Sequence, residues 1–232
     1  MLLSVIMPVY NEQATIQEII QRVLALKLDL ELIVVDDCST DGTREILNTL
    51  DQTAADARMK ILYHGQNQGK GAAIRTGIQN VNGGVVVVQD VDLEYDPTDL
   101  PDMLQPILDG KADAVYGSRF IGKGPHRVLF FWHMLGNKFL TLLSNIFTGL
   151  NLSDMESCYK MVRADILKHI KIEQNRFGFE PEITAKLAKI KDIRLYEIGI
   201  SYFGRSYEEG KKITWKDGFQ AIWCILKYWI VR

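Results

Sequence analysis

Asp90 and Asp92 directly follow the apolar run of residues 85–89, where a buried strand would meet solvent. With one residue between them in an extended backbone, the two carboxylates lie on the same side of the chain. Such a pair suits a hard divalent cation, which proteins often bind together with the phosphates of a substrate. The pair therefore indicates a metal-dependent site for a phosphate-bearing substrate, and the alternative is that both residues only cap the helix expected near Pro97.

A second acidic segment, DDCSTDGT at residues 36–43, partly imitates a calcium-binding loop. Its twelfth position, counted from Asp37, is Asn48 instead of the glutamate that such loops require, so a calcium site of this type is disfavoured. The segment is better explained as a strand end followed by a capped helix. In that arrangement an aspartate at the strand end could face a nucleotide base or ribose.

A glycine-rich segment, GQNQGKG at residues 65–71, imitates a phosphate-binding P-loop. One spacer residue is missing and Gly71 stands where Ser or Thr would bind magnesium, which disfavours a Walker ATPase. A glycine-rich loop that opens a helix can still present backbone N–H groups and a lysine to phosphate oxygens. The absence of G-x-G-x-x-G after the first apolar run and of G-x-S-x-G disfavours a dinucleotide-binding dehydrogenase and an α/β-hydrolase.

The elements that must position these segments alternate along the first half of the chain. Apolar, β-branched runs predict strands at residues 3–9, 31–36, 60–63, 85–89 and 112–116, and helical periodicity predicts helices at 14–26, 43–50, 71–81 and 98–108. Continuous hydrophobicity indicates strands that are covered on both faces. We therefore predict an α/β fold with a mostly parallel, Rossmann-like sheet and helices on both faces, in which ligands bind beyond the carboxyl ends of the strands.

The second half of the chain is organised differently. It contains an apolar stretch at residues 128–150, a strand near 157–163, a helix at 180–189, a strand at 193–201 and a final helix at 215–231. No Pro/Gly/Ser-rich linker separates the halves, so we predict one continuous catalytic domain at residues 1–213 and a C-terminal amphipathic helix at 214–232.

Composition narrows the functional classes. The 232 residues are 47% hydrophobic and 24% charged, which fits a single globular domain with a sizeable core. A formal net charge of -2 provides no basic field for nucleic acid. Three separated cysteines without a CxxC pair favour a reducing compartment, the cytoplasm. The sequence shows no secretory signal and no uninterrupted apolar stretch of transmembrane length.

Several of these segments together resemble the signature of a known family. They are PVYNE at residues 8–12, VVDDCSTDGT at 34–43, NQGKGAAIRTG at 67–77 and QDVDLEYDP at 89–97. Their order and spacing are similar to those of family 2 glycosyltransferases with the GT-A fold. GSRF at 117–120 and DMESCYKMVR at 154–163 extend the likeness to polyprenyl-phosphate sugar synthases such as dolichol-phosphate mannose synthase. The resemblance covers roughly residues 3–213.

The resemblance implies a nucleotide-diphosphate sugar, a GDP- or UDP-sugar, as the donor. Pro8, Tyr10 and Glu12 would line the nucleoside pocket. Asp37 would accept hydrogen bonds from the base or ribose, and Lys70 would lie near the nucleotide.

The resemblance also implies a divalent cofactor. Asp90 and Asp92 would hold Mg²⁺ or Mn²⁺ against the diphosphate, with Glu94 as a further ligand. Departure of a nucleoside diphosphate builds negative charge on its β-phosphate, and a cation at this position neutralises that charge.

The acceptor decides whether a general base is needed. A polyprenyl phosphate is already an anion and needs cations to hold it, for which Arg119 and Arg127 are the candidates. A sugar hydroxyl must lose a proton, and Glu156 or Asp154 could accept it. Both arginines could instead form only structural ion pairs, and Glu156 could be a helix-end or ion-pair residue.

A charged segment at residues 204–212 resembles the flexible basic loop of the family. In this likeness Arg205 and Lys212 would close over the diphosphate, and a lid of this kind would limit hydrolysis of the donor by water.

Two amphipathic stretches bear on the partners of the protein. In residues 130–148 a polar stripe lies opposite an apolar stripe, and the tail from residue 215 places tryptophans on a broad apolar face. Core packing is the first expectation for both stripes. Contact with a membrane surface is the alternative for both stretches, and contact with a second copy of the chain in a homo-oligomer is a further alternative for the tail.

We therefore expect an inverting, metal-dependent GT-A glycosyltransferase that transfers a sugar to a polyprenyl phosphate in glycan or cell-envelope biosynthesis. It would be peripheral on the cytoplasmic face of a membrane. The alternatives are transfer to a saccharide hydroxyl and a non-catalytic nucleotide-sugar binding protein.

Overall fold

A seven-stranded sheet in the order β3-β2-β1-β4-β6-β5-β7 forms the centre of the computed structural model. The structure describes the chain except residues 54–55, 123–126, 129, 206–214 and 231–232. The strands are β1 (Leu3–Val9), β2 (Leu30–Asp36), β3 (Met59–Tyr63), β4 (Val85–Val88), β5 (Ala114–Ser118), β6 (Lys160–Arg163) and β7 (Leu195–Gly199). Only β6 is antiparallel to its neighbours, so the sheet is mostly parallel, as predicted.

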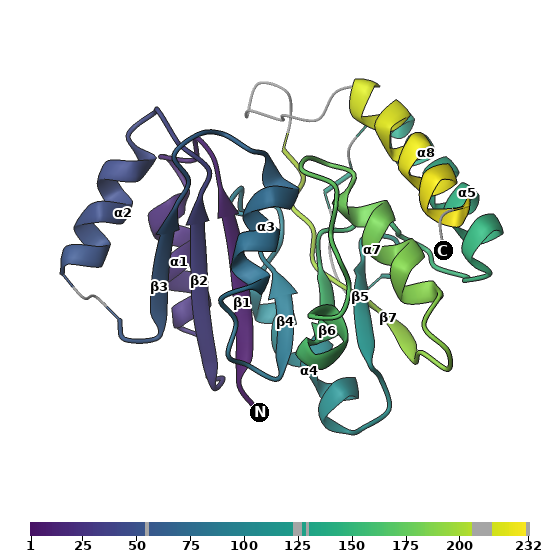
Figure 1. Cartoon of the computed structure of the whole chain (residues 1–232), viewed down its shortest axis with the longest axis horizontal. Helices are drawn as coiled ribbons and strands as arrows, with labels where there is room; N and C mark the ends of the chain where they lie inside the picture. Colours follow the sequence, from purple (N-terminus) through teal and green to yellow (C-terminus); the bar gives the residue numbers. More distant parts are fainter. Residues whose placement is uncertain (54–55, 123–126, 129, 206–214, 231–232) are drawn as a thin grey trace.

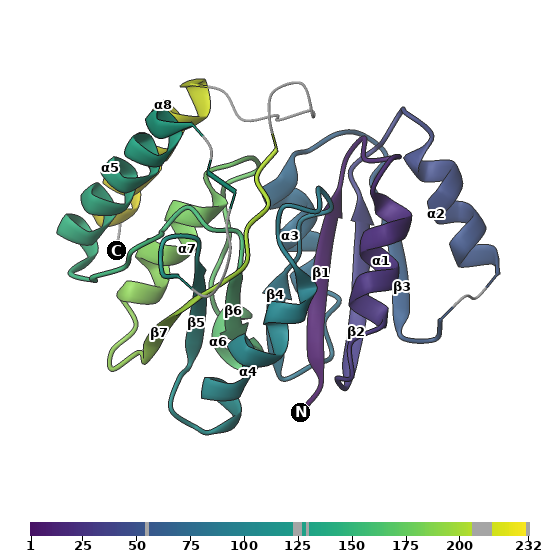
Figure 2. The same cartoon turned by 180° about the vertical axis from the view of Figure 1, so that it is seen from behind.

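Helices cover both faces of this sheet. In Figure 1, α3 (Lys70–Ile78) and α7 (Phe179–Ala188) lie in front of it, and the reverse view in Figure 2 shows α1 (Ile16–Leu24) and α4 (Leu100–Leu108) on the opposite face. The core strands β1, β2 and β4 are apolar and almost entirely buried, as expected for strands that lie between two helical layers.

The predicted elements of the first half are present. The first strand has the predicted bounds, and α2 (Thr43–Gln52) begins at the predicted residue. The helix predicted at 98–108 is divided into a 3-10 turn, η1 (Pro97–Asp99), and α4, because Asp96 caps the turn by accepting a hydrogen bond from the Thr98 N–H. The four-residue helix α6 (Ala164–Leu167) was not predicted, because it is too short to show a period.

Two long helices pack together at the end of the sheet that carries β7. They are α5 (Phe131–Thr148) and α8 (Trp215–Ile230), and both also contact α7. Figures 1 and 2 show them side by side, outside the two layers that cover the sheet. No helix in the described ranges is long and apolar enough to cross a bilayer. The predicted boundary between residues 213 and 214 lies outside the described residues.

Candidate active site

The loops after β1, β2 and β4 meet at the carboxyl edge of the sheet. Each contains one non-glycine residue in the left-handed region: Asn11 (φ 53°), Cys38 (φ 65°) and Leu93 (φ 61°). A conformation of this kind is rare for non-glycine residues and is found where surrounding contacts enforce it, often at functional sites. The Asn11 N–H donates to Ser39 Oγ at 3.0 Å, and Asn11 Oδ1 accepts from the Thr40 N–H at 2.8 Å. The first two loops are therefore fixed against each other.

Asp37 anchors the glycine-rich loop to the end of β2. Its carboxylate accepts from the backbone N–H of Gln68 at 2.9 Å and of Gly69 at 2.7 Å. It also lies 2.7 Å from Nδ1 of His64, whose Nε2 lies 2.9 Å from Thr76 Oγ1. An ionised carboxylate only accepts, so His64 carries its proton on Nδ1. Both oxygens of Asp37 thus have protein partners, and its role toward a nucleotide stays a prediction.

Gly69 and Gly71 let the loop lie directly against residues 174–176. Gly69 has φ 96°, and a Cβ on it would lie 2.3 Å from the carbonyl oxygen of Asn175. A Cβ on Gly71 would lie 2.2 Å from the carbonyl oxygen of Gln174. Close backbone packing therefore requires glycine at positions 69 and 71, whereas a Cβ on Gly65 would meet no atom within 4 Å.

Lys70 joins three segments that are distant in sequence. Its Nζ lies 2.9 Å from Asp90 Oδ1 and 3.1 Å from Glu180 Oε1, at the start of α7. Burial alone would lower the pKa of Lys70, but the negative charges of Asp90 and Glu180 outweigh burial and raise this pKa well above its ordinary value. Lys70 thus stays charged and holds Asp90 in place. Sequence analysis did not identify Glu180 as a partner, because 110 residues separate it from Lys70.

Asp92 has fewer protein partners than Asp90. In the described residues its carboxylate accepts the backbone N–H of Glu94 at 3.1 Å. Burial, followed by the charges of Asp90 and Glu94, raises the pKa of Asp92 to about 7. A neighbouring cation would favour the ionised form of this carboxylate.

Glu94 connects the same loop to the segment that follows β7. Its Oε2 accepts from the Tyr202 hydroxyl at 2.7 Å, and its Oε1 accepts from the Arg205 N–H at 2.7 Å. The Phe203 N–H donates to the Glu94 carbonyl at 2.8 Å. Glu94 therefore holds the start of the basic loop beside Asp92.

An open pocket of about 510 Å³ lies over these loops and has Asp92, Arg127 and Arg205 in its wall. The Arg127 guanidinium donates to the Gly204 carbonyl at 2.9 Å, and the Arg205 guanidinium lies 3.6 Å from the Glu12 carboxylate. Two arginines from different segments and two carboxylates, Glu12 and Asp92, thus line one open space. The pocket can hold an anion beside Asp92.

Arg119 lies behind this pocket. Its guanidinium donates twice to the buried carboxylate of Asp154, both at 2.7 Å, and lies 5.3 Å from the ring centre of Tyr202. A two-pronged pair of this kind fixes the orientation of both groups. Arg119 therefore connects the ends of β5 and β6 to Tyr202, the residue that binds Glu94.

Glu156 is half-buried and lies near Glu180 and Lys160. Its Oε1 has no hydrogen-bond partner among the described residues. Burial, followed by the charge of Glu180, raises the pKa of Glu156 to about 7. Burial also lowers the pKa of Lys160, whose ammonium group donates to the carbonyls of Met155 and Ser157. Glu156 is thus a carboxyl group that can take up or release a proton near neutral pH.

The carboxylates fit a divalent cation that arrives with a phosphate ligand. No group of three His, Cys, Asp or Glu side chains within the described ranges is arranged to hold a metal ion. Asp90 is engaged by Lys70, and Glu94 by Tyr202 and Arg205, which leaves Asp92 as the main oxygen donor. Proteins commonly bind Mg²⁺ through one or two carboxylates plus substrate phosphates. The donor set therefore agrees with a cation held between Asp92 and a diphosphate.

The structure brings most of the predicted site residues to this edge. Glu12, Asp92, Arg127 and Arg205 line the pocket. Asp37, Lys70, Asp90, Glu94 and Arg119 support it through the contacts above. Pro8 lies within β1, and Tyr10 is exposed just after it; neither lines the pocket. Lys212 lies outside the described residues. Asp154, a candidate base from sequence, is paired with Arg119. His64, Glu180 and Tyr202 were not identified from sequence, and their contacts form only in the folded chain.

Comparison with known proteins agrees with this architecture. The model of the family "Glycosyl transferase family 2" matches residues 4–171. An undecaprenyl-phosphate mannosyltransferase of Micrococcus luteus is 30% identical over 89% of this chain and 85% of its own length. A low-salt glycan biosynthesis hexosyltransferase of Haloferax volcanii is 30% identical over 95% of this chain, which spans 52% of that protein. A dolichol-phosphate mannosyltransferase of Pyrococcus furiosus is 29% identical over 92% of this chain and 61% of its own length.

Solved structures show the same fold. Glucosyl-3-phosphoglycerate synthase of Mycobacterium tuberculosis, crystallised with Mn²⁺, UDP and phosphoglyceric acid, superposes with a TM-score of 0.75. It is 19% identical, and the match covers 99% of this chain and 79% of that one. The predicted GT-A fold is therefore confirmed. With the family model matching most of the sequence and the predicted motifs gathered at one edge of the sheet, the chain belongs to glycosyl transferase family 2.

Proposed function

We propose that this chain transfers a sugar from a nucleotide-diphosphate sugar to a polyprenyl phosphate, with inversion at the anomeric carbon and in dependence on Mg²⁺ or Mn²⁺. The pocket that combines Asp92 with Arg127 and Arg205 carries the proposal. A donor diphosphate and an acceptor phosphate are both anions, and this pocket offers a place for a cation and two guanidinium groups. The names of the relatives from Micrococcus luteus and Pyrococcus furiosus support this substrate class.

The donor is expected to lie with its diphosphate beside Asp92. A divalent cation bound there acts as a Lewis acid for the departing nucleoside diphosphate. Lys70 holds Asp90 in place, and Glu94 keeps Arg205 near the diphosphate. In the proposed step an acceptor oxygen forms a bond to the anomeric carbon from the face opposite the leaving group, while the bond to the β-phosphate oxygen breaks.

The acceptor phosphate needs no general base, since it is already ionised. Arg127 is the proposed ligand of this phosphate, because it lines the same pocket as Asp92 and enters from a segment separate from Arg205. Arg119 is proposed to act indirectly, through Tyr202 and Glu94, because its guanidinium is already paired with Asp154.

A second candidate function is transfer to a saccharide hydroxyl. The observation in its favour is Glu156, which has one carboxylate oxygen without a partner in the described part of the chain and a pKa of about 7. These are properties of a general base that works near neutral pH.

Mass spectrometry of products tests the proposal against both alternatives. The chain is incubated with a panel of GDP- and UDP-sugars, a short polyprenyl phosphate or a saccharide, and Mn²⁺. Glycosylated polyprenyl phosphate is the expected product of the wild type and of Glu156→Gln, and Asp92→Asn is expected to form about 100-fold less. Product only with the saccharide, lost in Glu156→Gln, would favour the hydroxyl acceptor. Binding of nucleotide sugar without any product would favour a non-catalytic binding protein.

A further inference from the structure

Residues 172–176, between α6 and α7, lie directly against the glycine-rich loop, and we call them the support segment. The carbonyl oxygens of Gln174 and Asn175 occupy the space that a Cβ on either glycine of positions 69 and 71 would need. The Ala72 N–H, in the first turn of α3, donates to the Asn175 carbonyl at 3.3 Å. The support segment therefore fixes the start of the helix that carries Lys70.

A second set of contacts joins the support segment to α3. The Arg75 guanidinium donates to the Ile172 carbonyl at 3.3 Å and to Asn175 Oδ1 at 2.8 Å. Backbone atoms packed this closely cannot move independently of each other. A shift of the support segment should therefore move Lys70 and, through it, Asp90.

Helix α7 holds the backbone of the support segment from another side. Glu182 is fully buried, and its two carboxylate oxygens accept from the N–H groups of Glu173 and Gln174, both at 2.8 Å. Glu182 Oε1 also accepts from Lys186 Nζ at 2.6 Å. These bonds satisfy the buried carboxylate and engage only the backbone of Glu173 and Gln174.

The side chains of Glu173 and Gln174 are bound by Tyr228 of the last helix, α8. The Tyr228 hydroxyl accepts from Gln174 Nε2 at 2.8 Å and donates to Glu173 Oε2 at 3.1 Å. One hydroxyl thus connects α8 to two neighbouring residues of the support segment, 54 and 55 positions earlier in the chain.

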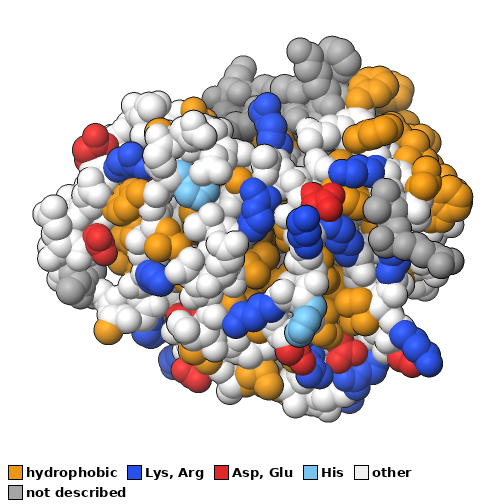
Figure 3. All heavy atoms as spheres, in the orientation of Figure 1, with side chains coloured by type: hydrophobic (Ala, Val, Ile, Leu, Met, Phe, Trp, Pro, Cys, Tyr) orange, Lys and Arg blue, Asp and Glu red, His pale blue; other side chains and the backbone are white. Residues whose placement is uncertain are grey.

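Two cations fix the ring that carries this hydroxyl. Tyr228 is 2% exposed, and the ammonium groups of Lys186 and Lys227 lie 4.7 and 4.8 Å from its ring centre. Cations at this distance are attracted to the face of an aromatic ring. Figure 3 shows Lys and Arg side chains on the surface where Figure 1 places α7. The hydroxyl is therefore held toward the support segment.

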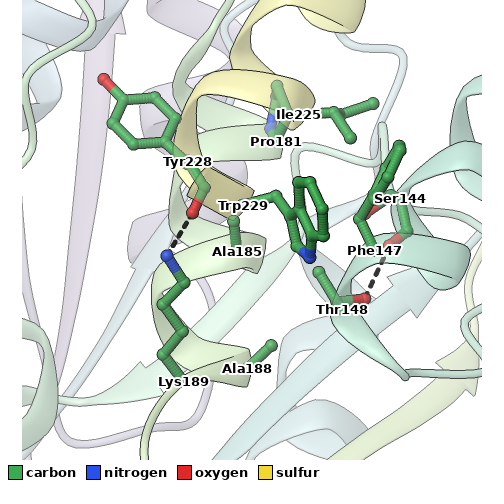
Figure 4. A pocket seen from close by; sticks show the side chains of 10 residues that line it. All are labelled: Ser144, Phe147, Thr148, Pro181, Ala185, Ala188, Lys189, Ile225, Tyr228 and Trp229. Carbon is green, nitrogen blue, oxygen red and sulfur yellow. Dashed lines mark hydrogen bonds between the residues drawn. The ribbon is translucent and has the colours of Figure 1, made fainter. Parts of the chain in front are cut away.

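Helix α8 has a separate attachment through the residue that follows Tyr228. The ring of Trp229 packs against Phe147 of α5, with the ring centres 4.9 Å apart. Figure 4 shows the Tyr228 ring pointing away from these two side chains, with Lys189 bonded to the Tyr228 carbonyl. The two neighbouring residues thus fasten α8 to different parts of the protein, Tyr228 to the support segment and Trp229 to α5.

We propose that Tyr228 is a positioning residue for the donor site, although it does not line the pocket. Its hydroxyl restricts the support segment, which in turn fixes the glycine-rich loop, Lys70 and Asp90. A site that is ordered before its ligand arrives binds more tightly, because less freedom is lost on binding. The inference deepens the proposed function and rests on it for the identity of the ligand, a divalent cation with a nucleoside diphosphate.

Tyr228→Phe tests this role, because it removes the hydroxyl and keeps the ring. Isothermal titration calorimetry with Mn²⁺ and UDP or GDP should show a Kd about three- to tenfold higher, the range expected for loss of one or two hydrogen bonds. Trp229→Phe is the matched control, since it changes the next residue of α8 at the other attachment. It should bind the nucleotide as the wild type does. Both substitutions can lower the melting temperature, but only Tyr228→Phe should change Kd.

A double-mutant cycle tests the path through Gln174. Gln174→Met removes the side-chain partner of the hydroxyl, so Tyr228→Phe/Gln174→Met should bind no more weakly than Tyr228→Phe alone. Effects of the two substitutions that multiply in Kd would contradict this path. A Tyr228→Phe variant that binds like the wild type, or a Trp229→Phe variant that is weakened equally, would overturn the proposal.

Hydrogen exchange tests the positioning role without nucleotide. The amides of Gln68 and Gly69, which bond to Asp37, should exchange about three- to tenfold faster in Tyr228→Phe than in the wild type or in Trp229→Phe. This exchange together with a wild type that transfers no sugar would retain the positioning role and reject the proposed function. Unchanged exchange in Tyr228→Phe, with sugar transfer by the wild type, would reject the positioning role alone.

Discussion

Asp37 illustrates how a site residue can act through the fold. Its carboxylate holds His64 and two backbone N–H groups of the glycine-rich loop, and that loop ends in Lys70, the partner of Asp90. A substitution of Asp37 should therefore alter the position of Lys70 and of its partner Asp90, although Asp37 need not contact the sugar.

We expect Asp37→Ala to lower the free energy of unfolding by about 2–4 kcal/mol, because it leaves the buried ring of His64 and two part-buried backbone N–H groups without an acceptor. Chemical denaturation measures this change. Asp29→Ala is the control, since Asp29 is exposed and should alter stability by less than about 0.5 kcal/mol. Equal effects of both substitutions would contradict the role of Asp37 as a loop anchor.

Glu156 should make stability depend on pH. The folded state binds its proton more tightly than the unfolded chain, because the pKa rises from 4.5 to about 7. The resulting stabilisation is complete below pH 4.5 and is lost as pH rises through 7, by up to about 3 kcal/mol.

Glu156→Gln should remove this contribution and make the dependence of stability on pH between about 5 and 8 less steep, while the contribution of Asp92 remains. Denaturant unfolding across this range measures it for both proteins. Identical pH profiles of wild type and Glu156→Gln would show that Glu156 has an ordinary pKa.

At the scale of elements, the reversed strand β6 has a functional consequence. It lies between β4 and β5, and the segment before it supplies Asp154, Glu156 and Cys158. This places Asp154 against Arg119 at the end of β5, and Arg119 against Tyr202 beyond β7. Strands β6, β5 and β7 are thereby linked to Glu94 in the loop after β4.

Tyr202→Phe should weaken this link, because it removes the hydroxyl that donates to Glu94 at 2.7 Å. Loss of a hydrogen bond to a charged group corresponds to about 1.5–3 kcal/mol, and we expect kcat for sugar transfer to fall about tenfold as Arg205 loses its support. Steady-state kinetics with varied donor measure the effect. Tyr196→Phe, on exposed β7, is the control and should leave kcat unchanged.

At the scale of the whole molecule, we expect the proposed metal site to need its substrate for completion. Asp90 and Glu94 already have protein partners, so Mn²⁺ alone has few oxygen donors in the described part of the protein. Its binding should therefore depend on a nucleoside diphosphate, whose phosphates supply further ligands.

Thermal unfolding measures this dependence. Mn²⁺ together with GDP or UDP should raise the free energy of unfolding by about 2.7 kcal/mol at a hundredfold excess over Kd, and either component alone by much less. EDTA should reverse the effect. A full stabilisation by Mn²⁺ alone would instead indicate a metal site formed by the protein itself.

Much of the first half of this chain could be predicted from its sequence. Apolar runs such as residues 85–88 require burial on both faces, and the alternation of such runs with helical periods requires a parallel sheet. The carboxyl ends of parallel strands share one edge, so the loops carrying Glu12, Asp37 and Asp90 had to meet there.

The contacts between segments that are distant in sequence could not be predicted from local periodicity, and only the tertiary structure shows them. The contact of Glu180 with Lys70, the reversal of β6 and the pairing of Arg119 with Asp154 all join segments that are separated by many residues. Helix α5 is a further example. Its helical periodicity predicts one polar and one apolar stripe, but it does not determine which stripe faces the protein. That choice depended on Thr141 and Asn145 finding backbone partners at residues 152 and 155, in the loop that follows the helix. These contacts satisfy buried polar groups and leave most of the apolar stripe outside.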